Sequence, residues 1–276
     1  MKRKNAVSDT IAIIKKECAG IEIKTGKEIH SINNDVISTG IEKLDNALCV
    51  GGLLKGSIVE IFGNPNAGKT TLALHISKQF QKMKKPVLYI DTERTLTSEI
   101  IAWEGVNTDD DFYVVRTNIL EEAFAICKLA AETFGLIVID SLPGLVRRAE
   151  MEDNIQDYYH EEPTEKDLSR FYPKILSELA KNECILVIIN QIRTRYHVMF
   201  GVPECTLGGK ALEFYATTRL DVRRADVLKD KWHTVTYGTE VNITVRKNKI
   251  SPSYHNDNDN AVKVNILNDG GLVELN

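Results

Sequence analysis

Residues 63–70 have the types and spacing of a loop that binds the phosphates of a nucleotide. Their sequence, Gly63-Asn64-Pro65-Asn66-Ala67-Gly68-Lys69-Thr70, fits the pattern G-x-x-x-x-G-K-[ST]. Glycines let backbone N–H groups converge on an anion, and a helix that starts at the end of the loop adds positive potential. We therefore expect Lys69 to reach the outer phosphates of ATP, Thr70 to ligate Mg²⁺, and Thr71 to complete the nucleotide contacts.

Two apolar runs that read as strands end in acids suited to work on these phosphates. Residues 136–139 lead into Asp140, which in a P-loop protein lies near the metal; the alternative is a cap on the next helix. Residues 87–90 lead into Asp91 and Glu93. Because strand ends face the ligand crevice, we favour Glu93, further past its strand, as the base that polarises an attacking water. Asp91 is its local rival, and a surface acid is the alternative for either.

A polar segment follows a further apolar run, residues 185–189. Its Gln191 could contact the γ-phosphate or orient the attacking water, as glutamines do in other P-loop hydrolases. From spacing alone, a loop glutamine that hydrogen-bonds to backbone explains it equally well.

Strand-like and helical patterns alternate around these residues. The strands are expected at 58–62, 87–90, 112–115, 136–139 and 185–189, and the helices near 68–82, 97–104, 119–133 and 165–181. This alternation predicts an α/β fold with a mostly parallel sheet covered on both faces. Runs at 218–224, 239–247 and 262–267 predict antiparallel additions. Pro173 is expected to kink the last helix or to make it start late.

Composition limits the class of protein. Of 276 residues, 43% are hydrophobic, which allows a proper core, and the net charge of −4 argues against indiscriminate coating of nucleic acid. The five cysteines form no C-x-x-C pair, and an odd number suits a reducing, cytoplasmic location. No apolar run approaches the length of a membrane span. An amphipathic helix at 6–19 and a polar linker up to residue 35 precede the core.

Further motifs follow in a characteristic order: Ser38-Thr39-Gly40, Leu44-Asp45, Gly51-Gly52-Leu53, the phosphate loop, Ile90-Asp91-Thr92-Glu93, Ile139-Asp140-Ser141, Asn190-Gln191-Ile192-Arg193, Val198-Met199-Phe200-Gly201, Gly208-Gly209, Phe214-Tyr215-Ala216, Arg219-Leu220-Asp221-Val222-Arg223-Arg224 and Lys247-Asn248-Lys249. With them the chain resembles the bacterial RecA strand-exchange recombinases from about residue 6 to its end. Many ATPases share the phosphate loop. The run 190–224 is shared by far fewer proteins, and it separates the chain from KaiC-like, RadA-like and replicative-helicase relatives.

The resemblance implies a RecA-like P-loop core, residues 36–276, behind a segment, residues 1–35, that docks on a neighbouring subunit. Glu93 is similar to the family's catalytic glutamate and Gln191 to its γ-phosphate sensor. Lys247 and Lys249 resemble the pair that reaches ATP held by the adjacent subunit of a helical filament. Without the resemblance, two solvated lysines on one face of an edge strand would be the simpler interpretation. Ile100 stands where the family places an aromatic residue against adenine, so apolar contact replaces stacking.

The resemblance also implies two DNA-binding loops. In the second, at 193–209, arginines neutralise phosphates and apolar wedges enter between bases, although a buried loop anchor is the alternative for the wedges. Its candidate residues are Arg193, Arg195, Val198, Met199, Phe200, Gly208 and Gly209. The first loop, near 151–163, is acidic and matches the family poorly. Ser169 and Arg170, at the start of the following helix, are expected to help hold the DNA backbone.

The implied activity is homologous pairing and strand exchange between single-stranded and duplex DNA, driven by DNA-stimulated ATP hydrolysis. The family's usual C-terminal domain does not follow, which fits a minimal recombinase or a truncated chain. The poorly matching first loop keeps an alternative open, a RecA-fold regulatory or scaffold assembly that binds ATP without strand exchange. A ring-forming kinase or helicase is a third hypothesis, separable by oligomer geometry.

Overall fold

The structure is a computed structural model that describes residues 2–18, 23–26, 35–152, 163–194, 204–232, 234–251 and 261–274. The chain divides into two units, residues 1–35 and 36–276. The first contains helix α1 (Lys2–Glu17), which begins four residues before the predicted start. Its apolar residues Val7, Ile13 and Ile14 are exposed.

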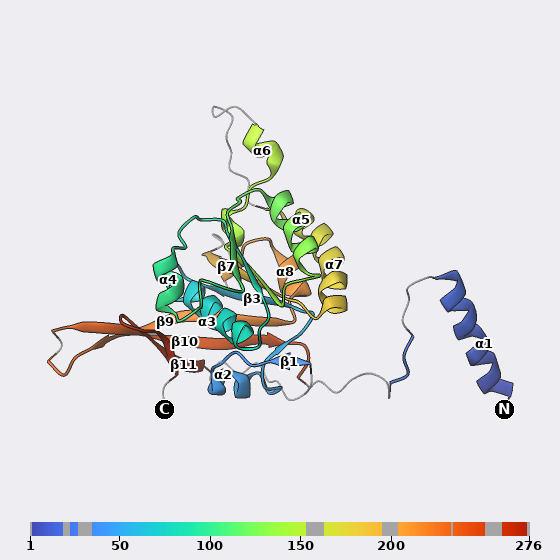
Figure 1. Ribbon diagram of the computed structural model, residues 1–276, viewed down its shortest axis with the longest axis horizontal. Helices are drawn as coiled ribbons and strands as arrows, with labels where there is room; N and C mark the ends of the chain where they lie inside the picture. The colour runs from blue at the N-terminus through green and yellow to red at the C-terminus, as the bar shows by residue number, and fades with distance from the viewer. Residues whose placement is uncertain are drawn as a thin grey trace. The chain divides into compact units, whose positions relative to one another are not determined.

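Apart from β1 and β2, the strands of the second unit form one sheet in the described part of the chain, in the order β12-β11-β10-β9-β3-β7-β6-β4-β5, with β8 paired to β7 (Figure 1). The strands are β3 (Ile58–Gly63), β4 (Val87–Asp91), β5 (Phe112–Val115), β6 (Leu136–Asp140), β7 (Ile185–Thr194), β8 (Glu204–Thr206), β9 (Thr218–Lys229), β10 (Thr236–Asn248), β11 (Ala261–Leu267) and β12 (Gly271–Glu274). Neighbours from β5 to β9 run parallel, and β10 to β12 continue antiparallel. The predicted mostly parallel sheet with antiparallel additions is confirmed. A separate ladder joins β1 (Val36–Ile37) to β2 (Leu53–Leu54).

Helices cover both faces of this sheet (Figure 1). The described helices of this unit are α2 (Glu42–Ala47), α3 (Lys69–Lys82), α4 (Ser98–Trp103), α5 (Leu120–Ala130), the 3-10 helix η2 (Leu142–Gly144), α6 (Arg148–Glu152), which projects beyond the sheet (Figure 1), α7 (Glu165–Asn182) and α8 (Lys210–Tyr215). Side chains of a strand alternate between faces, so Val59 packs in the core on the α3 side while Ile58 packs in the core on the α5 and α7 side. The central strands of the sheet are thus covered on both faces, which explains why their sequences are continuous apolar runs.

Helix α7 contradicts one of the two alternatives predicted from Pro173, the late start, while the kink stays a prediction. The helix starts at Glu165, behind a capping box between Thr164 and Asp167, and continues through Pro173 to Asn182. The late start is wrong because the capping box satisfies the first N–H groups. Pro173 lies on the exposed side of the helix, where water can reach the carbonyl that loses its donor.

The segment 194–209, expected to lack regular structure, is partly ordered by pairing. Strand β7 runs on to Thr194, and β8 pairs with it antiparallel, with Ile192 opposite Thr206 and Thr194 opposite Glu204. The short helix α8 then follows. This pairing was not predicted because three residues carry too little pattern to show a strand. None of the described helices is both long and apolar enough to span a membrane.

Candidate functional site

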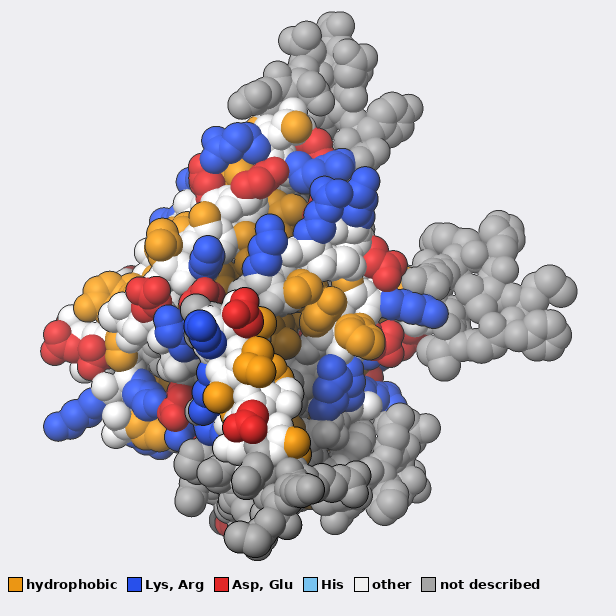
Figure 2. All heavy atoms as spheres, turned by 90° about the vertical axis from the view of Figure 1, so that its right-hand side faces the viewer, with side chains coloured by type: hydrophobic (Ala, Val, Ile, Leu, Met, Phe, Trp, Pro, Cys, Tyr) orange, Lys and Arg blue, Asp and Glu red, His pale blue; other side chains and the backbone are white. Residues whose placement is uncertain are grey.

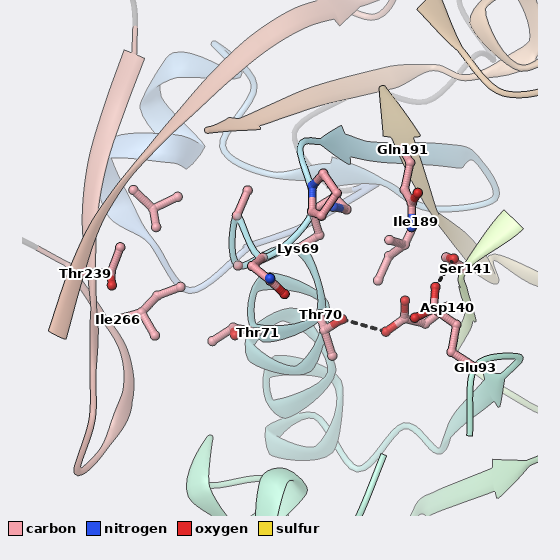
Figure 3. A pocket seen from close by; sticks show the side chains of 15 residues that line it. Lys69, Thr70, Thr71, Glu93, Asp140, Ser141, Ile189, Gln191, Thr239 and Ile266 are labelled. Atoms are coloured by element: carbon pink, nitrogen blue, oxygen red, sulfur yellow. Dashed lines mark hydrogen bonds between the residues drawn. The ribbon is translucent and has the colours of Figure 1, made fainter. Parts of the chain in front are cut away.

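A pocket of about 430 Å³ lies where the carboxyl ends of β3, β6 and β7 meet the start of α3 (Figure 3). It unites residues that are far apart in the sequence and that were predicted to act together, the phosphate loop with Glu93, Asp140 and Gln191. The lining residues are Pro65, Asn66, Ala67, Gly68, Lys69, Thr70, Thr71, Glu93, Asp140, Ser141, Ile189, Gln191, Thr239, Val241 and Ile266. Gly63 and Asn64, at the start of the loop, do not line it.

The loop depends on glycine at two positions. A Cβ on Gly63 would lie 2.0 Å from the carbonyl oxygen of Val222, so no other residue fits there without moving β9. Gly68 has a φ of 92° at the N-cap of α3, and a Cβ there would lie 2.4 Å from Ile266 Cδ1. These contacts explain why the loop has glycine at both positions.

Lys69 extends back into the loop that precedes it. Its side chain is buried, and Nζ donates to the carbonyls of Asn64 at 2.7 Å and Gly63 at 3.3 Å. Burial lowers the pKa of Lys69, while the nearby carboxyls of Asp140 and Glu93 raise it. The ammonium therefore lies inside the loop, where a phosphate group would meet it.

Thr70 and Asp140 form the oxygen pair predicted to hold a metal. Thr70 Oγ1 donates to Asp140 Oδ2 at 2.8 Å (Figure 3). Burial raises the pKa of Asp140, whereas the hydrogen bonds that it accepts lower it. A hydroxyl and a carboxylate in contact at the end of a phosphate loop are suited to a hard cation such as Mg²⁺.

Asp91, the last residue of β4, and Glu93, two residues later, have different surroundings. Glu93 is exposed, lines the pocket and accepts a hydrogen bond from Ser141. Asp91 is 2% exposed, accepts from the backbone N–H groups of Thr95 and Leu96, and does not line the pocket. The geometry supports the choice of Glu93 over Asp91; the catalytic role itself stays a prediction.

Gln191 lines the pocket and is tied through its neighbour to the base of the second loop. Asn190 Oδ1 accepts from the Gln191 N–H at 2.9 Å, and its Nδ2 donates to Leu207 O at 3.0 Å. Asn190 Nδ2 also donates to Glu60 at 2.9 Å, which is fully buried and paired with Arg219. We call Glu60, Asn190 and Arg219 the buried network; it joins β3, β7 and β9.

Lys247 and Lys249 do not line the pocket of their own chain. Both ammonium groups donate to the carbonyl of Phe214, and Lys247 also donates to that of Glu213, at the C-terminal end of α8. Carbonyls at a helix C-terminus attract cations. Burial, together with the charge of Lys249, lowers the pKa of Lys247 to about 8. Their role across a subunit interface stays a prediction.

Sequence reasoning missed one wall of the pocket, and the predicted contact of Ile100 with adenine stays a prediction. Thr239 and Val241 on β10 and Ile266 on β11 line the pocket beside the loop (Figure 3). Ile100, on α4, is 39% exposed and is not among the lining residues, so the structure gives no support for its contact with the base. Alternation marks residues 239 and 241 as one face of a strand. That this face meets the phosphate loop depends on the order of strands in the sheet.

The candidate DNA-binding residues are only partly within the described structure. Ser169 and Arg170 are exposed on α7, and Arg193 is exposed near the end of β7. Gly208 and Gly209 have φ angles of 83° and 64°, and a Cβ would lie 2.2 Å from Leu168 and 2.5 Å from Glu165, respectively, so they have a steric reason to be glycine. The remaining candidates of the second loop lie outside the described residues: Arg195, Val198, Met199 and Phe200. Most of the first loop, 151–163, also lies outside them. On the face in Figure 2, basic side chains lie in separate groups among acidic and hydrophobic ones.

Comparisons with known proteins agree with this arrangement. Residues 5–272 match the family model of the RecA N-terminal domain. Protein RecA of Wolbachia sp. subsp. Drosophila simulans (strain wRi) is 38% identical over 275 residues, 99% of this chain and 75% of that protein. Protein RecA of Syntrophobacter fumaroxidans (strain DSM 10017 / MPOB) is 35% identical over 277 residues, 99% of this chain and 80% of that protein.

The fold is also that of a solved structure. The crystal structure of the RadB recombinase superposes with a TM-score of 0.62 at 19% identity, covering 87% of this chain and 100% of that one. At this identity the likeness establishes the architecture alone. The family match and the identity to both RecA proteins, each spanning nearly the whole sequence, show that this chain belongs to the RecA family.

Proposed function

We propose that this protein is an ATP-dependent recombinase that forms a filament on single-stranded DNA and promotes homologous pairing and strand exchange with duplex DNA. One observation carries the proposal: in a chain of the RecA family, the phosphate loop, Glu93, Asp140 and Gln191 line one pocket. The enzymatic activity is DNA-dependent hydrolysis of ATP to ADP and phosphate.

The residues of the pocket suit ATP with Mg²⁺. Backbone N–H groups at the start of α3 and the Lys69 ammonium are matched to phosphate oxygens. Thr70 and Asp140 offer oxygens only, and the described residues contain no cluster of three or more His, Cys, Asp or Glu able to hold a metal alone. Mg²⁺ typically binds through one or two protein oxygens together with phosphates, which fits this donor set.

Each side chain then has a defined task in the proposed reaction. Bound Mg²⁺ would neutralise charge on the phosphate oxygens. Glu93 accepts a proton from the water that attacks the γ-phosphorus, and Ser141 holds its carboxylate in place. Lys69 stabilises charge on the outer phosphates, and Gln191 contacts the γ-phosphate.

We place Lys247 and Lys249 against ATP bound by the adjacent subunit. The pKa of Lys247 is lowered by burial first and then by the charge of Lys249, because two cations held side by side repel each other. A γ-phosphate held by the neighbouring subunit would relieve the repulsion between the two lysines. Both ammonium groups would then stabilise the negative charge that develops on it in the transition state. ATP would then join subunits as well as supply energy.

The DNA contacts are assigned to the segment 193–209 and to the start of α7. Gln191 and this segment are connected through Asn190, whose side chain bonds both the Gln191 N–H and the carbonyl of Leu207. A γ-phosphate bound to Gln191 is therefore one hydrogen-bonded residue away from the base of the DNA loop. This connection explains how ATP could raise DNA affinity.

The ATPase rate with and without single-stranded DNA, alongside electron microscopy of the same sample, tests the proposal. We expect stimulation by DNA, helical filaments with ATP, and joint molecules in a pairing assay. An ATPase indifferent to single-stranded DNA would overturn it. DNA binding without joint molecules would indicate a regulatory assembly, and closed rings would indicate a ring-forming ATPase.

A further inference from the structure

The hydroxyl of Tyr89 is a second hydrogen-bond donor to Asp140. Tyr89 lies in the middle of β4, is 0% exposed, and packs its ring against Phe112 in the core. Its OH donates to Asp140 Oδ2 at 2.7 Å, the oxygen that also accepts from Thr70 at 2.8 Å. A phenylalanine would fill this apolar position equally well, so packing of the core does not explain the hydroxyl. The hydrogen bond to Asp140 does.

This pair of donors, Thr70 and Tyr89, determines which oxygen of Asp140 is left free for a metal site. Within the described residues no hydrogen bond reaches Asp140 Oδ1, so two donors on Oδ2 orient the carboxylate and leave the other oxygen for metal-bound water. A hydroxyl has one proton and two lone pairs. Because the Thr70 proton points to Asp140, its lone pairs are free for a cation. The direction of those lone pairs depends on where Tyr89 holds the carboxylate.

The Tyr89 hydroxyl is placed beside Asp140 by strand pairing and stays protonated, so it can donate its hydrogen bond at neutral pH. It comes from β4, which pairs with β6, and its register partner on β6 is Val138, two residues before Asp140. Burial and the charge of Asp140 raise the pKa of Tyr89 well above its usual range, so the phenol keeps its proton at neutral pH.

We propose that Tyr89 is a positioning residue of the Mg²⁺–ATP site, which holds the Asp140 carboxylate so that Thr70 and Asp140 Oδ1 face the metal together. The proposal rests on the function proposed above. Tyr89 thus has a role in positioning the metal site although it lies in the apolar middle of β4.

The test compares Tyr89→Phe with Tyr172→Phe in the full chain. Tyr172 is a matched control because it is also 0% exposed and its hydroxyl has no partner among the described residues. Binding of a fluorescent ATP analogue is measured during titration with MgCl₂. Losing a hydrogen bond to a charged group should raise the half-saturating Mg²⁺ concentration roughly tenfold or more in Tyr89→Phe, with binding in EDTA unchanged. Tyr172→Phe should match the unmodified protein.

A double-mutant cycle separates positioning from packing. If Tyr89 acts through Asp140, adding Tyr89→Phe to Asp140→Asn should shift the Mg²⁺ requirement less than twofold. An equal Mg²⁺ requirement in Tyr89→Phe and the unmodified protein overturns the proposal, as does an equal shift in both backgrounds. Failure of the unmodified protein to bind the nucleotide with Mg²⁺ would instead refute the proposed function. Unfolding curves identify any variant that has lost its fold.

Discussion

Ser141 Oγ donates a hydrogen bond of 2.6 Å to Glu93 Oε1, from the end of β6 to the segment that follows β4. Ser141 is itself fixed, because its N–H donates to Thr92 Oγ1 at 2.8 Å and its carbonyl accepts from the same hydroxyl at 2.9 Å. A buried serine thus orients the exposed carboxylate proposed to polarise water. The first prediction follows from this contact.

Ser141→Ala should lower kcat for ATP hydrolysis roughly three- to tenfold, the effect expected from losing one hydrogen bond of about 1 kcal/mol to a carboxylate that water also reaches. ATP affinity should change little, because Ser141 orients the base and not the phosphates. Steady-state hydrolysis and equilibrium binding measure the two quantities. Ser57→Ala is the control, because its buried hydroxyl donates to Leu54 O, which does not line the pocket. Equal kcat in both variants would show that Ser141 does not orient Glu93.

Glu93→Gln should reduce hydrolysis roughly 100-fold or more while ATP still binds, because the amide cannot accept the proton from water. Asp91→Asn is the matched comparison. Its carboxylate accepts hydrogen bonds from two backbone N–H groups and pairs with Arg116, so we expect a loss of about 1–2 kcal/mol in unfolding free energy with most activity kept. Single-turnover hydrolysis and urea unfolding test both. Loss of chemistry in Asp91→Asn alone would reverse the assignment.

Lys247→Ala and Lys249→Ala should abolish filament ATPase while each subunit binds ATP almost normally, because neither lysine lines the pocket of its own chain. Mixing supplies the decisive measurement. Each lysine variant mixed with Glu93→Gln should regain activity, since a pocket with Glu93 can then face a neighbour with both lysines. If mixtures stay inactive at every ratio, the lysines do not act across the interface.

Lys247 should make stability depend on pH. Its pKa is lowered from 10.5 to about 8 in the folded chain, so the unfolded chain binds more protons between these values. Unfolding free energy therefore rises with pH from about 8 to 10.5 through this group. Lys247→Met keeps the apolar stem and should remove that rise. Urea midpoints from pH 7 to 10.5 test this, with exposed Lys128→Met as the baseline. Parallel curves for Lys247→Met and the unmodified protein would contradict it.

Glu60→Gln should cost about 3 kcal/mol of unfolding free energy, because it leaves the Arg219 guanidinium without its buried partner. It should also weaken DNA stimulation of the ATPase, since the buried network joins Gln191 to the loop base. Glu240→Gln, in an exposed pair with Lys263, should cost about 0.5 kcal/mol or less. Urea unfolding measures both. A loss of stability with full DNA stimulation would limit the network to a structural role.

Much of the fold could be read from local pattern. The strands of the parallel part and the helices between them lie within a few residues of their predicted bounds, because buried strands need continuous apolar runs and helices need a 3.6-residue period. The exceptions have local causes. Helix α7 starts at Glu165, ahead of Pro173, because a capping box precedes it, and the proline itself faces water. Strand β8 is three residues long and exists only by pairing with β7.

The sequence by itself determined the phosphate loop, the acids that end two strands, and the family, because each of these resides in residue types at short spacing. The tertiary structure alone decided which of them meet. Tyr89 and Asp140 are 51 residues apart, and they touch because β4 and β6 are neighbours in the sheet although β5 lies between them in the chain. The wall of Thr239, Val241 and Ile266 likewise reaches the loop through strand order. Such contacts depend on long-range pairing, which periodicity along one segment does not encode.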